Sequence, residues 1–273
     1  MKFYLTAIVL LSLSQYAVAD ATLTYSQSQS DSKPTSFSFL IRDQRLRVNE
    51  SGSERINLFK QSGSEFISYN PQNQQLDLMN PAILKARVDE LDQQRQQRIK
   101  QIETELQQKL AQMSKQEQEI GEALLNQIKY PAFYGEHTQI RVIPLKDRKT
   151  VSGIECRVYQ LVKQQQRIKE FCMAPAEALG LEQKDYQTLR SFYAFDYSML
   201  SQLMLAMGKS DFTVIDYDAH DMPGVVIEAI EFDQQQISQH TELRSFNNKP
   251  LQAEQLNLPE SLPGKIEPKK PVD

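Results

Sequence analysis

The sequence has few of the residues on which metal and redox centres depend. Its 273 residues include three histidines and two cysteines, which leaves little material for a metal cluster. Nine glycines and twelve prolines exclude a collagen-like chain and a Pro/Gly-rich disordered one. The formal net charge is −4, whereas a general nucleic-acid-binding protein carries a basic excess. The composition therefore fits a globular protein of one large domain or two small ones.

The motifs of common catalytic sites are also missing. The chain has no Gly-x-Ser-x-Gly, no Ser-x-x-Lys followed by Lys-Thr-Gly, and no His-Glu-x-x-His. The Ser-Gly-Ser sequences at 51–53 and 62–64 are typical of hairpin turns rather than of a phosphate-binding loop. We therefore predict that the protein is not an enzyme, and we expect neither catalytic residues nor a cofactor.

One acidic segment deserves a separate test as a metal site. On a strand, Asp216, Asp218 and His220 would share a face and could hold a divalent cation. The alternative is an acidic turn before Pro223 whose charges are simply solvated. No other cluster of histidine or cysteine accompanies the segment, so we predict no metal site there. A hydrolase using the carboxylates of residues 216–221 is the weakest of the functional hypotheses.

The first 19 residues are typical of a secretory signal. Lys2 gives the positive start, residues 3–13 are largely apolar, and Ala17-Val18-Ala19 is a small-x-small cleavage pattern. The apolar run is shorter than the roughly 20 residues that a membrane-spanning helix needs. We predict cleavage after Ala19, export, and a periplasmic location.

Export favours a disulfide between the only two cysteines, Cys156 and Cys172. Residues 154–162 and 167–174 alternate like two antiparallel strands. If Cys156 lies directly opposite Cys172, the loop between the strands has about three residues, an allowed hairpin length.

Strands dominate the rest of the chain outside two helical segments. Runs of β-forming residues alternate with turn residues at a spacing of about ten, which is typical of an antiparallel meander. The expected strands cover residues 22–28, 35–41, 45–49, 55–60, 65–69, 75–79, 138–143, 154–162, 167–174, 224–232 and 237–246.

The first helical segment covers residues 81–130. Asn80 and Pro81 fit the cap and the first helical position, and apolar residues then recur at steps of three and four. A single helix would be roughly 70 Å long and would project, forming a coiled coil with a partner or a second copy. Alternatively the segment breaks near Ser114 into an antiparallel pair. A third interpretation is a solvated, charged helix with one narrow packed stripe.

The second helical segment runs from residue 175 to about 207. Gly180 interrupts it early and Gly208 is a plausible stop. Its apolar residues either form plain core or line a ligand. Under the second interpretation the ligand-lining residues are Phe192, Leu200, Leu203, Met204 and Met207. The prolines and lysines from residue 262 onward are typical of a disordered tail.

Three stretches carry a family resemblance: Phe39-Leu40-Ile41-Arg42-Asp43-Gln44-Arg45-Leu46-Arg47-Val48, the Gly-x-x-Cys-x-x-Tyr strand within residues 151–159, and Pro223-Gly224-Val225-Val226-Ile227-Glu228 followed by residues 256–259. They are similar to the DUF4412 group of exported proteins. That group resembles the periplasmic lipoprotein carriers LolA and LolB, which implies an open, curved antiparallel sheet closed by helices over an apolar cavity. Residues 81–130 depart from the pattern as an insertion, and the family implies no catalytic residues.

Together these observations predict an α+β protein with a curved antiparallel sheet, or half-barrel, of about ten strands. The helix over residues 186–207 packs into its concave face. Residues 20–261 form a single domain, interrupted by the long helical insertion, and residues 262–273 form the tail. The leading functional hypothesis is a non-enzymatic periplasmic carrier for an apolar ligand, such as a lipid or a lipoprotein acyl chain. The alternative is an envelope interaction module that acts through residues 81–130.

Overall fold

The computed structural model describes residues 20–30, 32–110, 114–129, 140–209 and 215–259. The expected signal at residues 1–19 and the expected tail at residues 262–273 lie outside these ranges. None of the helices in the described ranges is long and apolar enough to cross a membrane.

All the strands belong to one open antiparallel sheet of eleven strands, in the order β6-β5-β4-β3-β2-β1-β11-β10-β9-β8-β7. Two meanders therefore meet where β1 pairs with β11, and β6 and β7 form the edges. This architecture confirms the predicted α+β class and fits a curved half-barrel. The strands are β1 (Ala21–Gln29), β2 (Thr35–Arg42), β3 (Arg45–Glu50), β4 (Ile56–Lys60), β5 (Glu65–Asn70), β6 (Gln75–Met79), β7 (Arg141–Val151), β8 (Ile154–Lys163), β9 (Gln166–Ala174), β10 (Val225–Asp233) and β11 (Gln236–Asn247).

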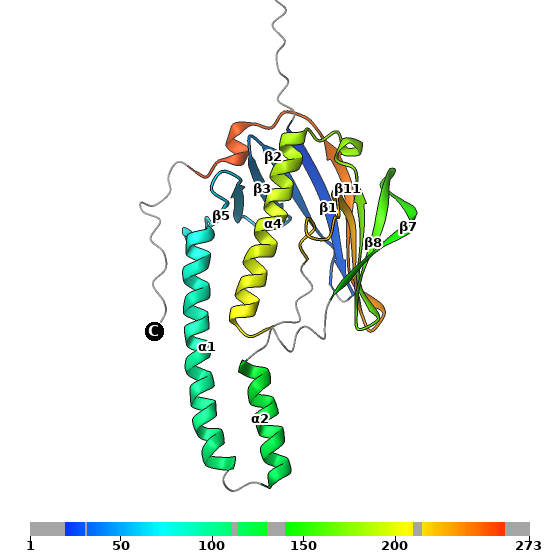
Figure 1. The fold of residues 1–273 in the computed structure, drawn as a ribbon. Helices are drawn as coiled ribbons and strands as arrows, with labels where there is room; N and C mark the ends of the chain where they lie inside the picture. Colours follow the sequence, from blue (N-terminus) through cyan, green and yellow to red (C-terminus); the bar gives the residue numbers. More distant parts are fainter. Residues whose placement is uncertain (1–19, 31, 111–113, 130–139, 210–214, 260–273) are drawn as a thin grey trace, which may run out of the picture.

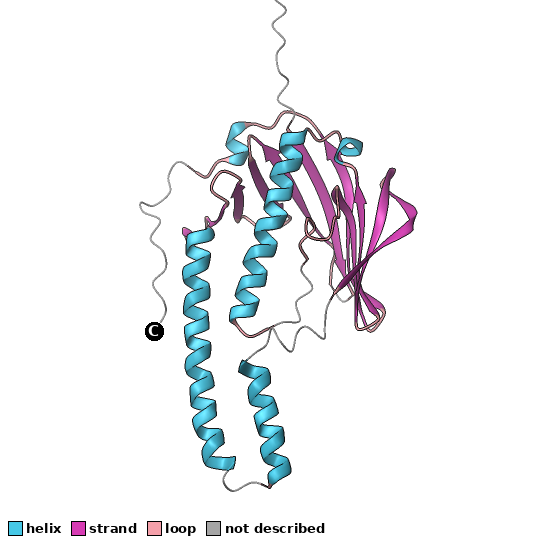
Figure 2. Ribbon diagram, in the orientation of Figure 1, coloured by secondary structure: helices cyan, strands magenta, loops and turns pink. Residues whose placement is uncertain are grey.

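In the described ranges three α-helices accompany the sheet, and they lie in two places (Figure 1). The helix α4 (Gln183–Ala206) crosses one face of the sheet and packs against β2 and β3. The helices α1 (Pro81–Leu110) and α2 (Lys115–Lys129) extend side by side beyond the sheet, as the colouring by secondary structure in Figure 2 makes plain. Two short 3-10 helices, η2 (Ala176–Leu179) and η3 (Ala253–Leu256), complete the described elements.

The segment between β6 and β7 is a helical hairpin rather than one long helix. Asn80 caps α1, since its Oδ1 accepts a hydrogen bond of 2.9 Å from the backbone N–H of Ile83. Ser114 and Glu117 form a reciprocal capping box at the start of α2. The two helices are then joined by an ion pair between Lys129 and Glu103. The break near Ser114 therefore follows from a local sequence that stabilises a new helix start.

The disulfide between Cys156 and Cys172 is present, with 5.4 Å between the two Cα atoms, but the expected register is wrong. Cys172 pairs with Val158, so the bond crosses the strand pair diagonally. Gln164 and Gln165 both have positive φ angles, of 49° and 65°, and make a two-residue turn.

The main hydrophobic core lies between α4 and the sheet. Leu189 and Phe195 of α4 are buried against inward-facing residues of β1 to β4. Thr188 fixes the helix laterally, since its hydroxyl donates a hydrogen bond of 3.0 Å to Oε1 of Gln61. Gln61 in turn donates to the hydroxyl of Ser191 over 3.0 Å. The middle of α4 is therefore held over the sheet by both apolar and polar contacts.

Candidate apolar binding site

An aromatic cluster lies where α4 crosses the N-terminal half of the sheet. Successive side chains of a strand point to opposite faces, so Phe37 and Phe39 of β2 lie on the same face. The ring centroid of Phe192 on α4 is 5.8 Å from that of Phe39 and 5.6 Å from that of Phe59. The cluster consists of Tyr25, Phe37, Phe39, Phe59, Phe66, Phe192 and Phe195.

Two cavities adjoin this cluster and share Val48, Glu50 and Phe192. The smaller, of about 180 Å³, is also lined by Asn57, Phe66, Phe195, Asp196 and Met199. The larger, of about 450 Å³, is also lined by Gln27, Thr35, Ser36, Phe37, Phe39 and Ser51. Because the three shared residues border both, we treat the two spaces as one concave-face groove, bounded by α4 on one side and by β2 and β3 on the other.

The polar residues of the concave-face groove are uncharged or acidic. Glu50 borders both cavities and Asp196 borders the smaller one, whereas no lysine or arginine is among the described residues that line either cavity. Burial raises the pKa of Asp196 above its usual value, because desolvation disfavours the carboxylate. The groove therefore combines apolar rings with an acidic rim, which opposes binding of an anionic group.

Of the five expected ligand-lining residues, the structure places one at the groove and four away from it. Phe192 borders both cavities, as expected of a ligand-lining residue. Leu200, Leu203, Met204 and Met207 border neither, and Met207 is 47% exposed. These four belong to the end of α4 that lies toward α1, where Gly208 approaches the side chain of Arg95. A role for them in binding stays a prediction.

Several residues of the groove were not predicted from the sequence, because they come from strands that are distant along the chain. Val48 of β3 and Phe66 of β5 reach the same space only through the sheet register. The alternation of aromatic residues in β2, Phe37 and Phe39, was the one available indication of an aromatic face. Met199 and Phe195, four residues apart on α4, follow the helical period of the same face.

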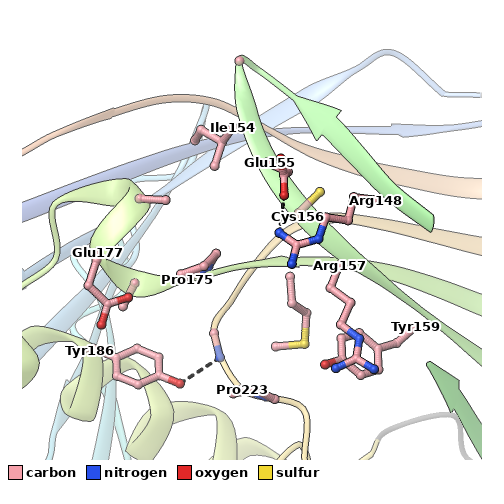
Figure 3. Close-up of a pocket in the computed structure, with 15 residues that line it drawn as sticks. Arg148, Ile154, Glu155, Cys156, Arg157, Tyr159, Pro175, Glu177, Tyr186 and Pro223 are labelled. Carbon is pink, nitrogen blue, oxygen red and sulfur yellow. Dashed lines mark hydrogen bonds and ion pairs between the residues drawn. The ribbon is translucent and has the colours of Figure 1, made fainter. Parts of the chain in front are cut away.

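A larger cavity, of about 610 Å³, lies beside the disulfide, but its surroundings are charged (Figure 3). Arg148 forms an ion pair with Glu155 across it. The guanidinium of Arg157 lies 5.3 Å from the ring centroid of Tyr159. The hydroxyl of Tyr186 accepts a hydrogen bond of 2.9 Å from the backbone N–H of Gly224. Since these polar groups satisfy one another, the cavity is a weaker candidate for an apolar ligand.

The acidic segment at residues 216–221 is a turn and not the strand on which the metal hypothesis depended. Oδ1 of Asp216 accepts hydrogen bonds from the backbone N–H groups of Asp218 and Ala219, over 2.9 and 3.1 Å. Asp218 forms an ion pair with Arg190. Within the described ranges no three potential ligand side chains gather in a way that could hold a metal ion. Asp216 thus shapes the turn, and Asp218 joins it to α4.

One buried charge network was missed by the sequence reasoning. Glu228 of β10 is 6% exposed, forms an ion pair with Lys149 and is hydrogen-bonded over 3.0 Å to Nε2 of His240. A glutamate inside the apolar run of β10 was the available signal, but its partners lie on other strands. Both carboxylate oxygens are engaged, so the network stabilises the C-terminal half of the sheet.

The comparisons with known proteins add little to this description. No family model matches the chain, and no curated protein matches it. The expected DUF4412 membership therefore stays a resemblance only.

Among solved structures, the Pseudomonas aeruginosa MucA/MucB complex is similar at 10% identity and a TM-score of 0.37. That match covers 89% of this chain and 56% of the other. A structure of MucB is similar at 8% identity and a TM-score of 0.36, covering 89% and 58%. A structure of PNGF-II has 8% identity and a TM-score of 0.37, covering 88% and 30%. The chain thus spans less than two thirds of the length of each of these three structures. At these TM-scores the likeness carries no inference about function.

Proposed function

We propose that the protein is a non-enzymatic carrier that binds an apolar ligand, a lipid or a lipoprotein acyl chain, in the concave-face groove. The proposal rests on one observation: two cavities adjoin at Phe192, on the face of the sheet that α4 covers. The larger cavity alone falls within the range of roughly 300–1,000 Å³ typical of small-molecule sites.

The chemistry of the lining favours an apolar chain. Burying each CH₂ group of an acyl chain gains about 0.8 kcal/mol, so a short length of chain already supplies substantial affinity. The aromatic rings provide this apolar surface, and Met199 adds a flexible side chain that adapts to irregular shapes. Glu50 and Asp196 at the rim disfavour a free fatty acid or a phosphate headgroup. We therefore expect an esterified or amide-linked acyl chain with a neutral or cationic polar end.

Movement of α4 would admit the ligand. Phe192, Phe195, Asp196 and Met199 belong to this helix, whereas the other residues that line the groove belong to the sheet or to the turn after β3. A shift of the helix would therefore widen both cavities together. In an exported protein of this kind the ligand would be an envelope lipid or lipoprotein, and the periplasmic location is part of the proposal.

Native mass spectrometry after gentle purification tests for a co-purified lipid, and titration with a fluorescent acyl probe measures the affinity. The variant Val48→Phe fills the space that the two cavities share. Its matched control is Val142→Phe, on a partly buried strand residue that borders neither cavity. We expect Val48→Phe to weaken probe binding at least about tenfold, which corresponds to ~1.4 kcal/mol. Equal affinity in both variants, with equal thermal stability, would contradict the proposal.

A second candidate function has its own observation. Ile120, Leu124 and Ile128 of α2 are exposed at steps of four residues, so they form an apolar stripe along one side of the helix. Residues 81–130 carry eight basic and eight acidic side chains, a balance that permits pairing with an identical segment. We propose self-association of two copies through this stripe as the alternative role.

Light scattering coupled to size exclusion tests the alternative. Leu124→Lys should convert a dimer to a monomer, whereas Asn126→Lys, an equally cationic change on an exposed neighbour, should leave it a dimer. A monomeric wild-type protein at concentrations of about 100 μM would remove this candidate and leave the carrier proposal untouched.

A further inference from the structure

The first turn of α4 contains a buried carboxyl group. The side chain of Asp185 is 1% exposed, and neither of its carboxylate oxygens has a hydrogen-bond partner among the residues that the structure describes. A buried ionised group without a counter-charge or hydrogen bonds is strongly destabilising, so such a site calls for a proton or a cation. Nothing in the concave-face groove uses Asp185, because that groove begins about two turns further along α4.

The carboxyl groups around Asp185 outnumber the cations near them. Asp20, Asp43 and Glu182 are close enough to act on it electrostatically, and so is Lys184. Nζ of Lys184, however, lies 3.5 Å from Glu182.

Nε of Arg42 lies 3.0 Å from Asp43 and 3.7 Å from Asp20, so this cation too is shared among other carboxylates. Burial, together with this acidic surrounding, raises the pKa of Asp185 to about 7. The neighbourhood holds four carboxyl groups and two cations, and each cation already contacts a carboxylate other than Asp185.

Asp20 brings a further feature to this neighbourhood. It is 1% exposed, and its Oδ2 accepts a hydrogen bond from the backbone N–H of Leu251, which fixes the residue just before β1. Figure 1 shows the start of β1 and the first turn of α4 at the same end of the sheet. Asp20 is also the residue that follows the expected cleavage after Ala19, so processing would convert its backbone nitrogen from an amide to a primary amine.

We propose that removal of the leader frees an α-ammonium group at Asp20 that binds Asp185 as its counter-ion and fastens the first turn of α4 to the start of β1. In the cleavage one peptide bond is hydrolysed by water, which yields the carboxylate of Ala19 and the amine of Asp20. The amine takes up a proton from solvent at neutral pH. Leader removal then completes the attachment of the helix that covers the groove, so the unprocessed chain would hold α4 less firmly. The inference depends on the predicted cleavage site and is independent of which ligand the groove binds.

The experiment uses the full chain, exported with its own leader from a bacterium with a periplasm and purified from that compartment. Mass spectrometry of the N-terminal peptide first identifies the start of the mature protein, which we expect to be Asp20. The rate at which limiting acetic anhydride acylates the α-amino group is then measured in the wild type and in Asp185→Asn. Lys85 of α1, an exposed amine outside this neighbourhood, serves as the internal reference. The control variant is Asp43→Asn, which removes a neighbouring exposed carboxylate and suits the positive φ of 50° at that position.

We expect Asp185→Asn to acylate at least about tenfold faster than the wild type, since loss of one strong partner lowers the pKa of an amine by about one unit or more. Asp43→Asn should change the rate less than about threefold, as expected of a more distant, exposed charge. If Asp185→Asn fails to fold, the pKa of the α-amino group in the folded and urea-unfolded wild type decides instead, with an elevated folded value expected. A mature start other than Asp20, or equal rates in wild type and Asp185→Asn, would overturn the proposal.

Discussion

The sheet with α4 and the α1–α2 hairpin are held together by different means. In the sheet region the stabilising contacts join residues far apart in the sequence, such as Phe59 with Phe192 and Cys156 with Cys172. In the hairpin most ion pairs are local and exposed, such as Lys85 with Asp89 four residues along. Exposed pairs of this kind contribute only about 0.3–0.5 kcal/mol each. The comparison teaches that buried long-range contacts hold the sheet region, whereas the hairpin buries few apolar side chains, Leu84 and Ile99 of α1 among them, and relies more on local pairs.

The largest expected difference between the two regions comes from truncating a large side chain in each. Phe59 is fully buried in the aromatic cluster, and Phe59→Ala should lower the free energy of unfolding by about 3–5 kcal/mol. Leu124→Ala, at an exposed position of α2, should change it by less than about 0.5 kcal/mol. Urea unfolding followed by near-UV circular dichroism measures both. Similar losses in the two variants would mean that the hairpin belongs to the cooperative core.

Removing the disulfide tests how far the sheet region depends on long-range constraint. The bond joins two cysteines that are 16 residues apart in the sequence. The Cys156→Ala/Cys172→Ala double variant should lower the free energy of unfolding by about 3 kcal/mol, because its unfolded chain has more conformational freedom. The helical circular dichroism of α1 and α2 should persist, because no disulfide constrains them. A urea midpoint equal to that of the oxidised wild type would show that the bond is dispensable.

Much of this division could be predicted from the sequence, because it follows from local patterns. Alternating residues and turn residues place most strands within two positions, and Asn80-Pro81 marks the start of α1. The strand β7 is the exception: residues 138–143 were expected, whereas the described strand covers Arg141–Val151. Pro144 and the charged residues after it do not resemble a strand. They are tolerated because β7 is an edge strand with a register shift between Pro144 and Arg148.

The candidate site could not be predicted to the same extent, for a physical reason. Its cavities are the space left where α4 meets strands about 130 to 160 residues earlier, and packing of this kind leaves no periodic pattern in the sequence. Helical periodicity identifies the apolar side of α4 but not which of its turns face empty space. Phe192 was therefore anticipated together with four residues that border neither cavity.

Carboxyl groups in the first turns of α4 and α2 should make stability depend on pH in opposite directions. Burial raises the pKa of Asp185 from 3.8 to about 7, whereas hydrogen bonds from Ser114 lower the pKa of Glu117. A carboxyl with a raised folded pKa contributes stability that is complete below its unfolded value. That contribution is lost as the pH rises through the folded value.

In a chain that keeps residues before Asp20, stability relative to Asp185→Asn should therefore fall between about pH 4 and 7. The slope should reach at most ~1.4 kcal/mol per pH unit. For Glu117 the sign is opposite: its contribution is lost as the pH falls. Urea midpoints at four pH values measure both effects, and parallel curves for wild type and Asp185→Asn would refute the first.

The smallest expected effect is confined to the hairpin and tests whether the hairpin and the sheet unfold separately. Ser114 caps α2, since its Oγ accepts a hydrogen bond of 3.4 Å from the backbone N–H of Glu117, and its hydroxyl donates to Oε2 of the same residue over 2.7 Å. Ser114→Ala removes the side-chain cap, at a cost of about 1 kcal/mol to the helix start. In Ser114→Thr, a conservative control, the hydroxyl remains and most of the cap should be retained.

Because α2 lies outside the sheet's core, we expect amide hydrogen exchange to accelerate in the first turns of α2 while β1 to β5 keep wild-type protection. Acceleration spread evenly over the sheet would instead show that the hairpin and the sheet unfold as one unit, and the distinction between the two regions would then fail.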